Sequence, residues 1–413
     1  MEVAFYQFLT GRRTLGESLK NVFKRKVAGG ASITGITLAA ALGRPMRGEW
    51  NPVSLKHAPF DLAAISFNTP GAPRAYLAAK NLRNLGKIVI AGGPHPSVLP
   101  EEALNCFDAV CIGPGDVRFP RMVADAEQGK LKQVYYGGPG EWIIPQRKPR
   151  RGLSIMQLSR GCHRSCRLCV VPSLFPAGVD EKPMHLVKAE LAQTPSSISI
   201  IDDNFPVNTR RSSEVLSLLR DFNKKFYCQV SAESASDINN LRNLADAGCT
   251  LVGVGIESIN HRSRAFLGKQ PIDDAKGIIQ RIHDTGMGSY INLVFGSDGE
   301  TCDIFEKTLR FIEEARPSVV SPHILTPLPG TRIFKNFMKR NRLLFGREAF
   351  PQAWADFDCR HVVIRPDPMT PDELNMGFSR FIKELFSLRN TIRRAPKESF
   401  GTALISSILK NAW

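Results

Sequence analysis

The sequence lacks any uninterrupted apolar run of about 18 residues, the length that marks a membrane-spanning helix. Its first residues also lack the charged start and long apolar stretch of a secretion signal. Disulfide-stabilised secreted domains are short and carry an even set of cysteines, whereas this long chain has nine cysteines, most of them isolated. We therefore expect a cytoplasmic protein whose thiols are reduced.

Acidic residues are scarce relative to basic ones. The chain has 55 Lys and Arg residues against 39 Asp and Glu residues, which gives a net charge of +16. Such a surplus favours anionic partners, such as acidic lipid headgroups, a phosphorylated substrate, nucleic acid or an acidic electron donor. An ordinary basic surface would explain the same charge, because net charge informs on association and not on fold. The chain gives no firm evidence for nucleic acid.

The remaining composition is that of a globular protein. Hydrophobic residues make up 43% and charged residues 23%, so we expect a sizeable core. A chain of 413 residues suggests two domains and a small third region. We place these at residues 1–142, 152–342 and 343–413, with a basic linker at residues 143–151.

The first region contains alternating strand and helix patterns. An apolar run, Asp61–Ser66, precedes a helical stretch, Ala75–Gly86, and a second apolar run, Lys87–Gly93. Strand, helix and strand in this order predict parallel strands joined by crossover helices. We therefore expect an open, Rossmann-like parallel sheet with a ligand site at the carboxyl ends of its strands. The basic, glycine-rich residues 9–60 give no confident further strand.

The second region alternates strand and helix six times. This pattern predicts a partial (β/α)6 barrel or a doubly wound sheet. Six units leave such a barrel open at one side, which makes room for a large substrate. The six expected strands are Leu153–Leu158, Ser197–Asp202, Phe226–Ser231, Leu251–Ile256, Tyr290–Phe295 and Val319–Leu325.

The third region is expected to be small and mostly helical. Thr370 is a capping residue and Pro371 suits the first helical position, so a helix should begin there and extend to about Arg394. Residues 393–413 form a basic amphipathic stretch which, together with the basic residues Arg12–Lys26, suggests peripheral contact with an anionic membrane. The alternative is an ordinary terminal helix that packs across the mouth of the barrel.

Three cysteines lie close together directly after the first strand of the second region. Cys162, Cys166 and Cys169 are spaced by four and three residues. Thiolates are the usual protein ligands of iron–sulfur clusters, and three of them would leave the fourth iron of a 4Fe–4S cluster free to bind another group. A zinc site would need four protein ligands, often as two separated pairs, and the chain has no second pair with such spacing. The pattern therefore favours a 4Fe–4S cluster.

The Cys-x3-Cys-x2-Cys loop after the first strand of a six-unit β/α barrel resembles the radical S-adenosylmethionine superfamily. The resemblance implies that the free iron chelates S-adenosylmethionine. It further implies that an electron from the reduced cluster cleaves this molecule to a 5′-deoxyadenosyl radical. A reducing flavodoxin or ferredoxin is the implied electron donor. Leu168 departs from the pattern, because members often carry an aromatic residue before the last cysteine.

Polar residues gather at the carboxyl ends of the expected barrel strands, which is typical of an active-site face. In the superfamily the end of the second strand often holds the amino group of S-adenosylmethionine, and a carboxylate suits an ammonium group. The candidate S-adenosylmethionine residues are Asp202, Asp203, Asn204, Ser231, Glu233, Glu257 and Asn292.

The first region resembles the cobalamin-binding domain that precedes the barrel in one large class of the superfamily. Glycines directly after strands would let the backbone approach a bulky flat ligand. No Asp-x-His-x-x-Gly sequence is present, so a histidine ligand below the cobalt is not indicated, and His95 is expected to be a loop residue. The candidate cobalamin residues are Ser66, Asn68, Thr69, Gly92, Gly93, His95, Gly113 and Gly115.

The resemblance implies a cobalamin-dependent methyltransferase that acts on an unactivated carbon through a 5′-deoxyadenosyl radical and methylcobalamin. Two alternatives stay open. A cobalamin-free radical enzyme would perform cyclisation, oxidation or sulfur insertion, and an iron–sulfur electron-transfer protein would normally supply four cysteines to its cluster. The substrate could be a small molecule, a lipid-like molecule or a peptide.

Overall fold

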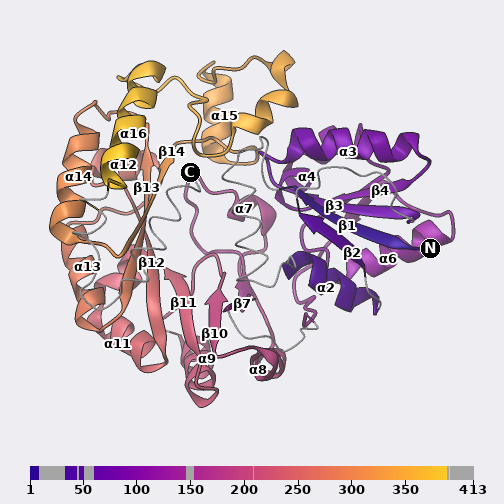
Figure 1. Cartoon of the computed structure of the whole chain (residues 1–413), viewed down its shortest axis with the longest axis horizontal. Helices are drawn as coiled ribbons and strands as arrows, with labels where there is room; N and C mark the ends of the chain where they lie inside the picture. Colours follow the sequence, from indigo (N-terminus) through magenta and orange to yellow (C-terminus); the bar gives the residue numbers. More distant parts are fainter. Residues whose placement is uncertain are drawn as a thin grey trace.

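The computed structural model contains two parallel sheets of six strands each. Figure 1 shows them side by side, with the amino-terminal sheet at one end of the molecule and the curled second sheet at the other. The expected α/β class, an open sheet followed by a partial barrel, is confirmed. The structure describes residues 1–8, 33–43, 46–50, 60–145, 153–207, 209–387 and 390.

The amino-terminal sheet has the strand order β2-β1-β3-β4-β5-β6. Its order reverses between β1 and β3, and open parallel sheets bind ligands at the carboxyl ends of strands beside such a switch. The strands are β1 (Val3–Phe8), β2 (Arg47–Trp50), β3 (Leu62–Phe67), β4 (Ile88–Gly92), β5 (Ala109–Ile112) and β6 (Val134–Tyr136). The helices are α2 (Ile33–Leu42), α3 (Ala72–Asn84), α4 (Pro94–Val98), α5 (Pro100–Leu104) and α6 (Arg118–Glu127).

Helices cover both faces of this sheet, because successive side chains of each buried strand point to opposite sides. Phe5 and Ala64 belong to the core beneath α2 and α6, whereas Tyr6 and Ile65 belong to the core beneath α3. Figure 1 shows α3 on one side of the sheet and α2 with α6 on the other. Sequence analysis placed no strand before Asp61, but the structure adds two, of which β1 lies inside the sheet and pairs with β2 and β3.

The second sheet is curled and its strands follow chain order, β14-β13-β12-β11-β10-β7, so the six expected strands are confirmed. Helices lie on its outer side (Figure 1). The strands are β7 (Leu153–Met156), β10 (Ser197–Ile200), β11 (Lys225–Val230), β12 (Cys249–Glu257), β13 (Gly288–Phe295) and β14 (Val319–Ile324). The helices between them are α7 (Val171–Leu174), α8 (Met184–Gln193), α9 (Arg210–Asp221), α10 (Ala232–Ser236), α11 (Ile238–Asp246), α12 (His261–Phe266), α13 (Ala275–Asp284) and α14 (Ile304–Ala315). A short antiparallel ribbon joins β8 (Ser159–Arg160) to β9 (Asp180–Glu181).

The carboxy-terminal region contributes to both cores and does not pack as a separate unit. Trp354 of η2 (Gln352–Asp356) and Phe357 join the core of the amino-terminal sheet, together with α15 (Arg332–Lys339). Helix α16 (Pro371–Leu385) places Phe381 4.8 Å from the ring of Phe295 in β13. A short helix, η1 (Arg347–Ala349), precedes η2.

The start of α16 is confirmed and its expected end is wrong. Thr370 and Glu373 form a capping box, in which the Thr370 side chain accepts from the backbone N–H of Glu373. The helix stops at Leu385 and not near Arg394. The Ser387 N–H donates to the Glu384 carbonyl at 3.1 Å in a tighter turn, and the Asn390 side chain donates to the same carbonyl at 2.8 Å, so this helix-end carbonyl is satisfied without a further helical turn.

Several expectations fall outside the described residues: most of the basic linker 143–151, the basic stretch Arg12–Lys26 and the amphipathic stretch 393–413. Among the helices that the structure does describe, none combines the length and the apolar character needed to cross a membrane.

Candidate active site

The three cysteines of the cluster loop line one cavity of about 330 Å³ at the carboxyl ends of the barrel strands. The loop is fixed on both sides: the Arg167 N–H donates to the Leu267 carbonyl at 2.9 Å, and the Ile333 N–H donates to the Arg167 carbonyl at 3.1 Å. Gly161 begins the loop with φ +87°, and a Cβ there would lie 2.2 Å from the Gly178 carbonyl oxygen. Only glycine fits this position.

The cysteine side chains suit a cluster better than a single ion. Within the described part of the chain, no three His, Cys, Asp or Glu side chains come close enough to share one metal ion. Thiolates of a 4Fe–4S cluster bind different irons and so need not converge on one point. Burial raises the pKa of the Cys169 thiol to about 11, so cluster binding there must displace a proton.

Five of the seven candidate S-adenosylmethionine residues share this cavity with the cysteines. They are Asp203, Asn204, Ser231, Glu233 and Glu257. Asp203 sits against the cluster loop, since its carboxylate accepts from the Gly161 N–H at 2.9 Å. Burial raises the pKa of Asp203, and that hydrogen bond opposes the rise.

Asp202 and Asn292 are not among the lining residues. The Asp202 carboxylate faces the opposite way and accepts from the Leu158 N–H at 2.7 Å and the Ser159 hydroxyl at 2.6 Å. Burial raises its pKa to about 6. Asp202 therefore shapes the approach to the cluster loop. Asn292 is half-buried on β13, on the concave face opposite the core residues Ile291 and Leu293.

Sequence analysis missed the cations of this cavity, which are Arg164, Arg264 and Lys269. Lys269 Nζ lies 2.9 Å from Glu257 Oε1, and Arg164 pairs with Glu233 at 2.8 Å. Burial opposes the charge of Lys269, but Glu257 and the nearby thiols outweigh it and raise the pKa of the ammonium group. No spacing in the sequence marks Lys269, because the folding of α12 brings it back to the end of β12.

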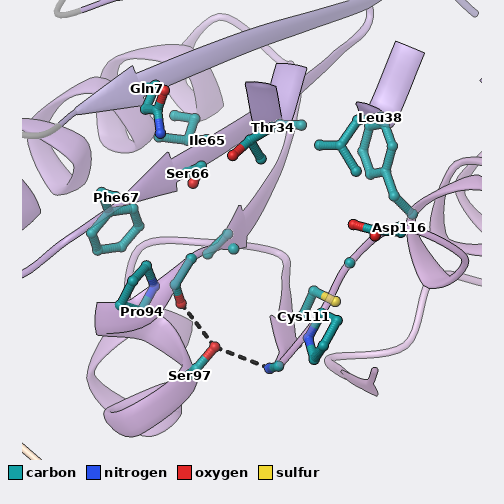
Figure 2. Close-up of a pocket in the computed structure, with 18 of the residues that line it drawn as sticks. Gln7, Thr34, Leu38, Ile65, Ser66, Phe67, Pro94, Ser97, Cys111 and Asp116 are labelled. Atoms are coloured by element: carbon teal, nitrogen blue, oxygen red, sulfur yellow. Dashed lines mark hydrogen bonds between the residues drawn. The ribbon is translucent and has the colours of Figure 1, made fainter. Parts of the chain in front are cut away.

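A second cavity, of about 520 Å³, lies at the carboxyl ends of β1, β3, β4 and β5, beside the switch in strand order. Figure 2 shows its walls. Six of the eight candidate cobalamin residues line it: Ser66, Asn68, Gly92, Gly93, Gly113 and Gly115. Ser97, which sequence analysis missed, ties two of the glycine loops together. Its hydroxyl donates to the Gly93 carbonyl at 2.8 Å and accepts from the Gly113 N–H at 3.0 Å.

The glycines of this second cavity serve two purposes. Gly93 has φ +98°, and a Cβ there would lie 2.9 Å from the Ser66 hydroxyl oxygen, so the turn requires glycine. A Cβ on Gly92 would meet nothing within 4 Å, so the absent side chain leaves open space at the wall. Gln7 adds a buried Oε1 that has no hydrogen-bond partner among the described residues. These walls fit a bulky, largely apolar ligand with polar groups at its edge.

His95 and Thr69 were expected at the second cavity but do not line it. His95 lies in α4 and is fully buried, which corrects the expectation of a loop residue. Its Nδ1 lies 3.2 Å from Thr69 Oγ1, and its Nε2 lies 3.2 Å from both the Tyr76 hydroxyl and Glu102 Oε1. Among the described residues no histidine lines this cavity.

The two cavities share one wall. Within a single loop after β10, Ile201 lines the second cavity, whereas Asp203 and Asn204 line the cluster cavity. The neighbouring segment after β7 also contributes to both cavities. Arg160 lines the second cavity, and Cys162 lines the cluster cavity. Groups bound in the two cavities would therefore lie on either side of a few residues.

Comparison with known proteins supports this geometry. Residues 156–312 match the radical SAM superfamily. A bacteriochlorophyllide d C-8(2)-methyltransferase from Chlorobaculum tepidum is 25% identical over 342 residues, which cover 76% of this chain and 74% of that protein.

Two solved structures share the fold over most of the chain. The radical S-adenosylmethionine methyltransferase TsrM from Kitasatospora setae, with cobalamin and a [4Fe-4S] cluster bound, has a TM-score of 0.64 at 14% identity and covers 92% of this chain and 85% of its own. The cobalamin-dependent S-adenosylmethionine radical enzyme OxsB, with aqua-cobalamin and S-adenosylmethionine bound, has a TM-score of 0.65 at 13% identity. It covers 100% of this chain and 71% of its own.

Proposed function

The chain is a member of the radical SAM superfamily, and we propose that it is a cobalamin-dependent methyltransferase that acts on carbon. The observation that carries this proposal is the shared wall between the two cavities. One cavity has three thiols and charged pairs, and the other has glycine loops and a buried amide. Methyl transfer to an unactivated carbon needs both sets of groups close together.

When bound, the cluster with S-adenosylmethionine supplies hydrogen abstraction, and cobalamin supplies methyl transfer. The chain positions these groups. Cys162, Cys166 and Cys169 would hold the cluster, leaving one iron for S-adenosylmethionine. Asp203 and the Glu257–Lys269 pair offer charges of both signs, which suit the amino and carboxyl groups of that molecule.

We place the substrate against the concave face of the barrel sheet, next to the cluster cavity. Tyr227, Tyr290 and Asn292 are half-buried on this face, and none of them is an acidic or basic residue type such as Asp, Glu, Lys or Arg. Gly253 makes room for a tyrosine, because a Cβ there would lie 2.5 Å from the Tyr227 hydroxyl. Gln229, on the same face of β11 as Tyr227, lines the cluster cavity. The substrate is therefore a largely uncharged molecule with a broad apolar or aromatic surface. The Chlorobaculum relative is named for methyl transfer to bacteriochlorophyllide d.

Product analysis tests the proposal without knowledge of the substrate. Anaerobic protein loaded with iron, sulfide and hydroxocobalamin is incubated with S-adenosylmethionine and a reductant. We expect S-adenosylhomocysteine, which reports methyl donation, and 5′-deoxyadenosine, which reports reductive cleavage. 5′-Deoxyadenosine that forms without any effect of cobalamin would support the cobalamin-free enzyme instead. Formation of neither product would support an electron-transfer protein.

The surface around the cluster loop suits an acidic electron donor such as a flavodoxin or ferredoxin. Three segments meet there, residues 160–171, 258–271 and 328–343, and none contains an Asp or Glu. Their exposed cations include Arg167, Arg262, Arg332 and Lys335. Complementary charge would steer a negatively charged donor to the side of the protein that holds the cluster.

A cytoplasmic location fits this chemistry. All nine cysteines are free thiols, and a cluster held by thiolates requires a reducing environment. Membrane contact through residues 393–413 stays a prediction from sequence.

A further inference from the structure

Arg160 occupies an unusual position between the two cavities. It ends the short strand β8, two residues before Cys162, and its side chain is 9% exposed. Its guanidinium group pairs with the Asp116 carboxylate and lies 3.9 Å from the centre of the Trp142 ring. It also donates to the Glu141 carbonyl and to the Gln157 side chain, both at 3.3 Å. One side chain thus joins its own segment to two others that are distant in sequence.

Asp116 belongs to the other domain. It directly follows the Gly113-Pro-Gly loop after β5, and both Asp116 and Arg160 line the second cavity. The loop itself is closely packed, since a Cβ on Gly137 would lie 1.8 Å from the Pro114 carbonyl oxygen. Figure 2 shows Asp116 at the cavity beside Cys111 and Leu38. The ion pair therefore connects a glycine loop of the second cavity to the root of the cluster loop.

This ion pair differs in kind from the surface pairs of the molecule. Both partners are largely buried, at 9% and 14% exposure, so neither can exchange its partner for water without cost. The planar guanidinium group can stack on the indole ring of Trp142 while its N–H groups bond in fixed directions, which a lysine cannot reproduce. The ion pair therefore fixes the relative direction and the separation of the two segments that it joins, as well as attracting them to each other.

We propose that Arg160 and Asp116 are positioning residues that set the separation of the two cofactors across the shared wall. This inference rests on the proposed function, because it requires cobalamin in one cavity and the cluster in the other. The pair does not need to touch the reacting atoms. It holds the glycine loop and the cluster loop at a fixed distance and orientation. A misplacement of about 1 Å can reduce the rate of a reaction roughly 100-fold.

The test uses full-length protein loaded with both cofactors, in wild-type form and as Arg160→Lys, Arg160→Ala, Asp116→Asn and the charge-swapped double variant Arg160→Asp with Asp116→Arg. Arg121→Ala is the matched control, because its ion pair with Asp125 stays within α6 and joins no second segment. The main readout is electron paramagnetic resonance. Relaxation of the cob(II)alamin signal by the reduced cluster falls steeply with the distance between them. Iron content and cobalamin content are measured on the same samples.

We expect the three single variants at this pair to keep both cofactors but to show altered relaxation, and to form S-adenosylhomocysteine about 100-fold more slowly. The charge-swapped variant should recover part of the wild-type relaxation, and Arg121→Ala should match wild type. Unchanged relaxation in Arg160→Lys and Asp116→Asn with full cofactor content would overturn the inference. So would loss of cobalamin from these variants, because the pair would then be a binding group. Failure of wild-type protein to retain cobalamin would instead count against the proposed function.

Hydrogen exchange provides a second measurement that needs no cofactor. Amide groups of the loop at residues 113–117 should exchange faster in cofactor-free Asp116→Asn and Arg160→Lys than in wild type. Equal protection in all three proteins would show that the ion pair does not hold the loop, and would overturn the inference even if Arg160→Ala fails to fold.

Discussion

The two cavities recognise their ligands by different physical means. The cluster cavity is lined by thiols, carboxylates and three cations, two of which form the pairs Glu257–Lys269 and Arg164–Glu233. The second cavity has glycine loops, apolar side chains and one buried amide, and its main charges are the mutually paired Arg160 and Asp116. Charge would select a ligand of the first cavity, whereas shape and backbone approach would select a ligand of the second. Substitutions that alter charge or volume should therefore affect the two cavities separately.

Removing the thiols gives the largest expected effect. Replacing Cys162, Cys166 and Cys169 together with Ser should abolish iron binding and reduce cleavage of S-adenosylmethionine to background, because thiolates hold the cluster. The same protein should retain hydroxocobalamin through gel filtration, since these cysteines do not line the second cavity. Iron retained at wild-type levels would contradict the cluster assignment. Loss of both cofactors would contradict the separation of the cavities.

Filling the second cavity should prevent cobalamin binding and leave the cluster in place. Gly92→Leu places a large side chain in the open space at the cavity wall and should abolish cobalamin retention, while iron content stays at the wild-type level. Gly92→Ala is the matched control, because its Cβ would meet nothing within 4 Å and should be tolerated. Absorbance of protein-bound cobalamin after gel filtration reports both results. Wild-type retention by Gly92→Leu would mean that the ligand lies elsewhere.

The shared wall is sensitive to pH through Asp202. Burial raises its pKa to about 6, so the folded protein holds this proton more tightly than the unfolded chain does. The protonated carboxyl therefore stabilises the folded state fully below the pKa of the unfolded chain, and this stabilisation is lost as pH rises through about 6. Its size is on the order of 3 kcal/mol, at about 1.36 kcal/mol per pKa unit. Asp202→Asn lacks this titration. The excess in unfolding free energy of wild type over Asp202→Asn should fall between about pH 4 and pH 7, as measured by urea unfolding. A pH-independent difference would contradict this account of Asp202.

Breaking a charged pair in the cluster cavity should weaken ligand binding without abolishing it. Lys269→Met removes an ammonium group that would face the carboxylate of S-adenosylmethionine, and losing one partner of such a charged pair costs about 2 kcal/mol or more, so the Kd for S-adenosylmethionine should rise roughly 30-fold or more. Lys276→Met is the control, because the Lys276–Glu314 pair is exposed. Isothermal titration on cluster-loaded protein measures both. Equal affinities for the two variants would show that Lys269 does not face the ligand.

Surface charge should give the smallest effect. Arg332→Glu with Lys335→Glu should slow cluster reduction by reduced flavodoxin about tenfold at low salt, and the difference should shrink as salt screens the surface. Reduction by dithionite bypasses docking and should not change. Slower reduction by both reductants would indicate damage to the cluster site and would contradict a docking role for this surface.

The features that sequence analysis found are those that local patterns encode. The cluster loop and the six barrel strands follow from residue spacing and apolar runs, and the start of α16 follows from Thr370 and Pro371. The glycines of the second cavity were found because turns after strands restrict residue type. By contrast, Lys269 and Ser97 reach their sites only through the packing of helices, which no local spacing reports.

Two groups of candidate residues lie away from the cavities that sequence patterns suggested for them. His95 and Thr69 lie within motifs that otherwise line the second cavity, but α4 turns His95 into a buried network with Tyr76 and Glu102. That network also accepts a hydrogen bond from Trp354, 252 residues further along the chain. Asp202 and Asp203 are adjacent in sequence, yet only Asp203 lines the cluster cavity. Successive side chains of an extended segment point to opposite sides, which separates Asp202 from Asp203. A sequence motif does not show which side faces the cavity.

One measurement tests the central claim that a single chain holds both cofactors in adjacent cavities. Wild-type protein is reconstituted anaerobically with iron, sulfide and hydroxocobalamin at micromolar concentration and passed through gel filtration. We expect about four irons per chain, together with the visible spectrum of bound cobalamin in the same protein fraction. A fraction that contains the cluster but no cobalamin would contradict the claim.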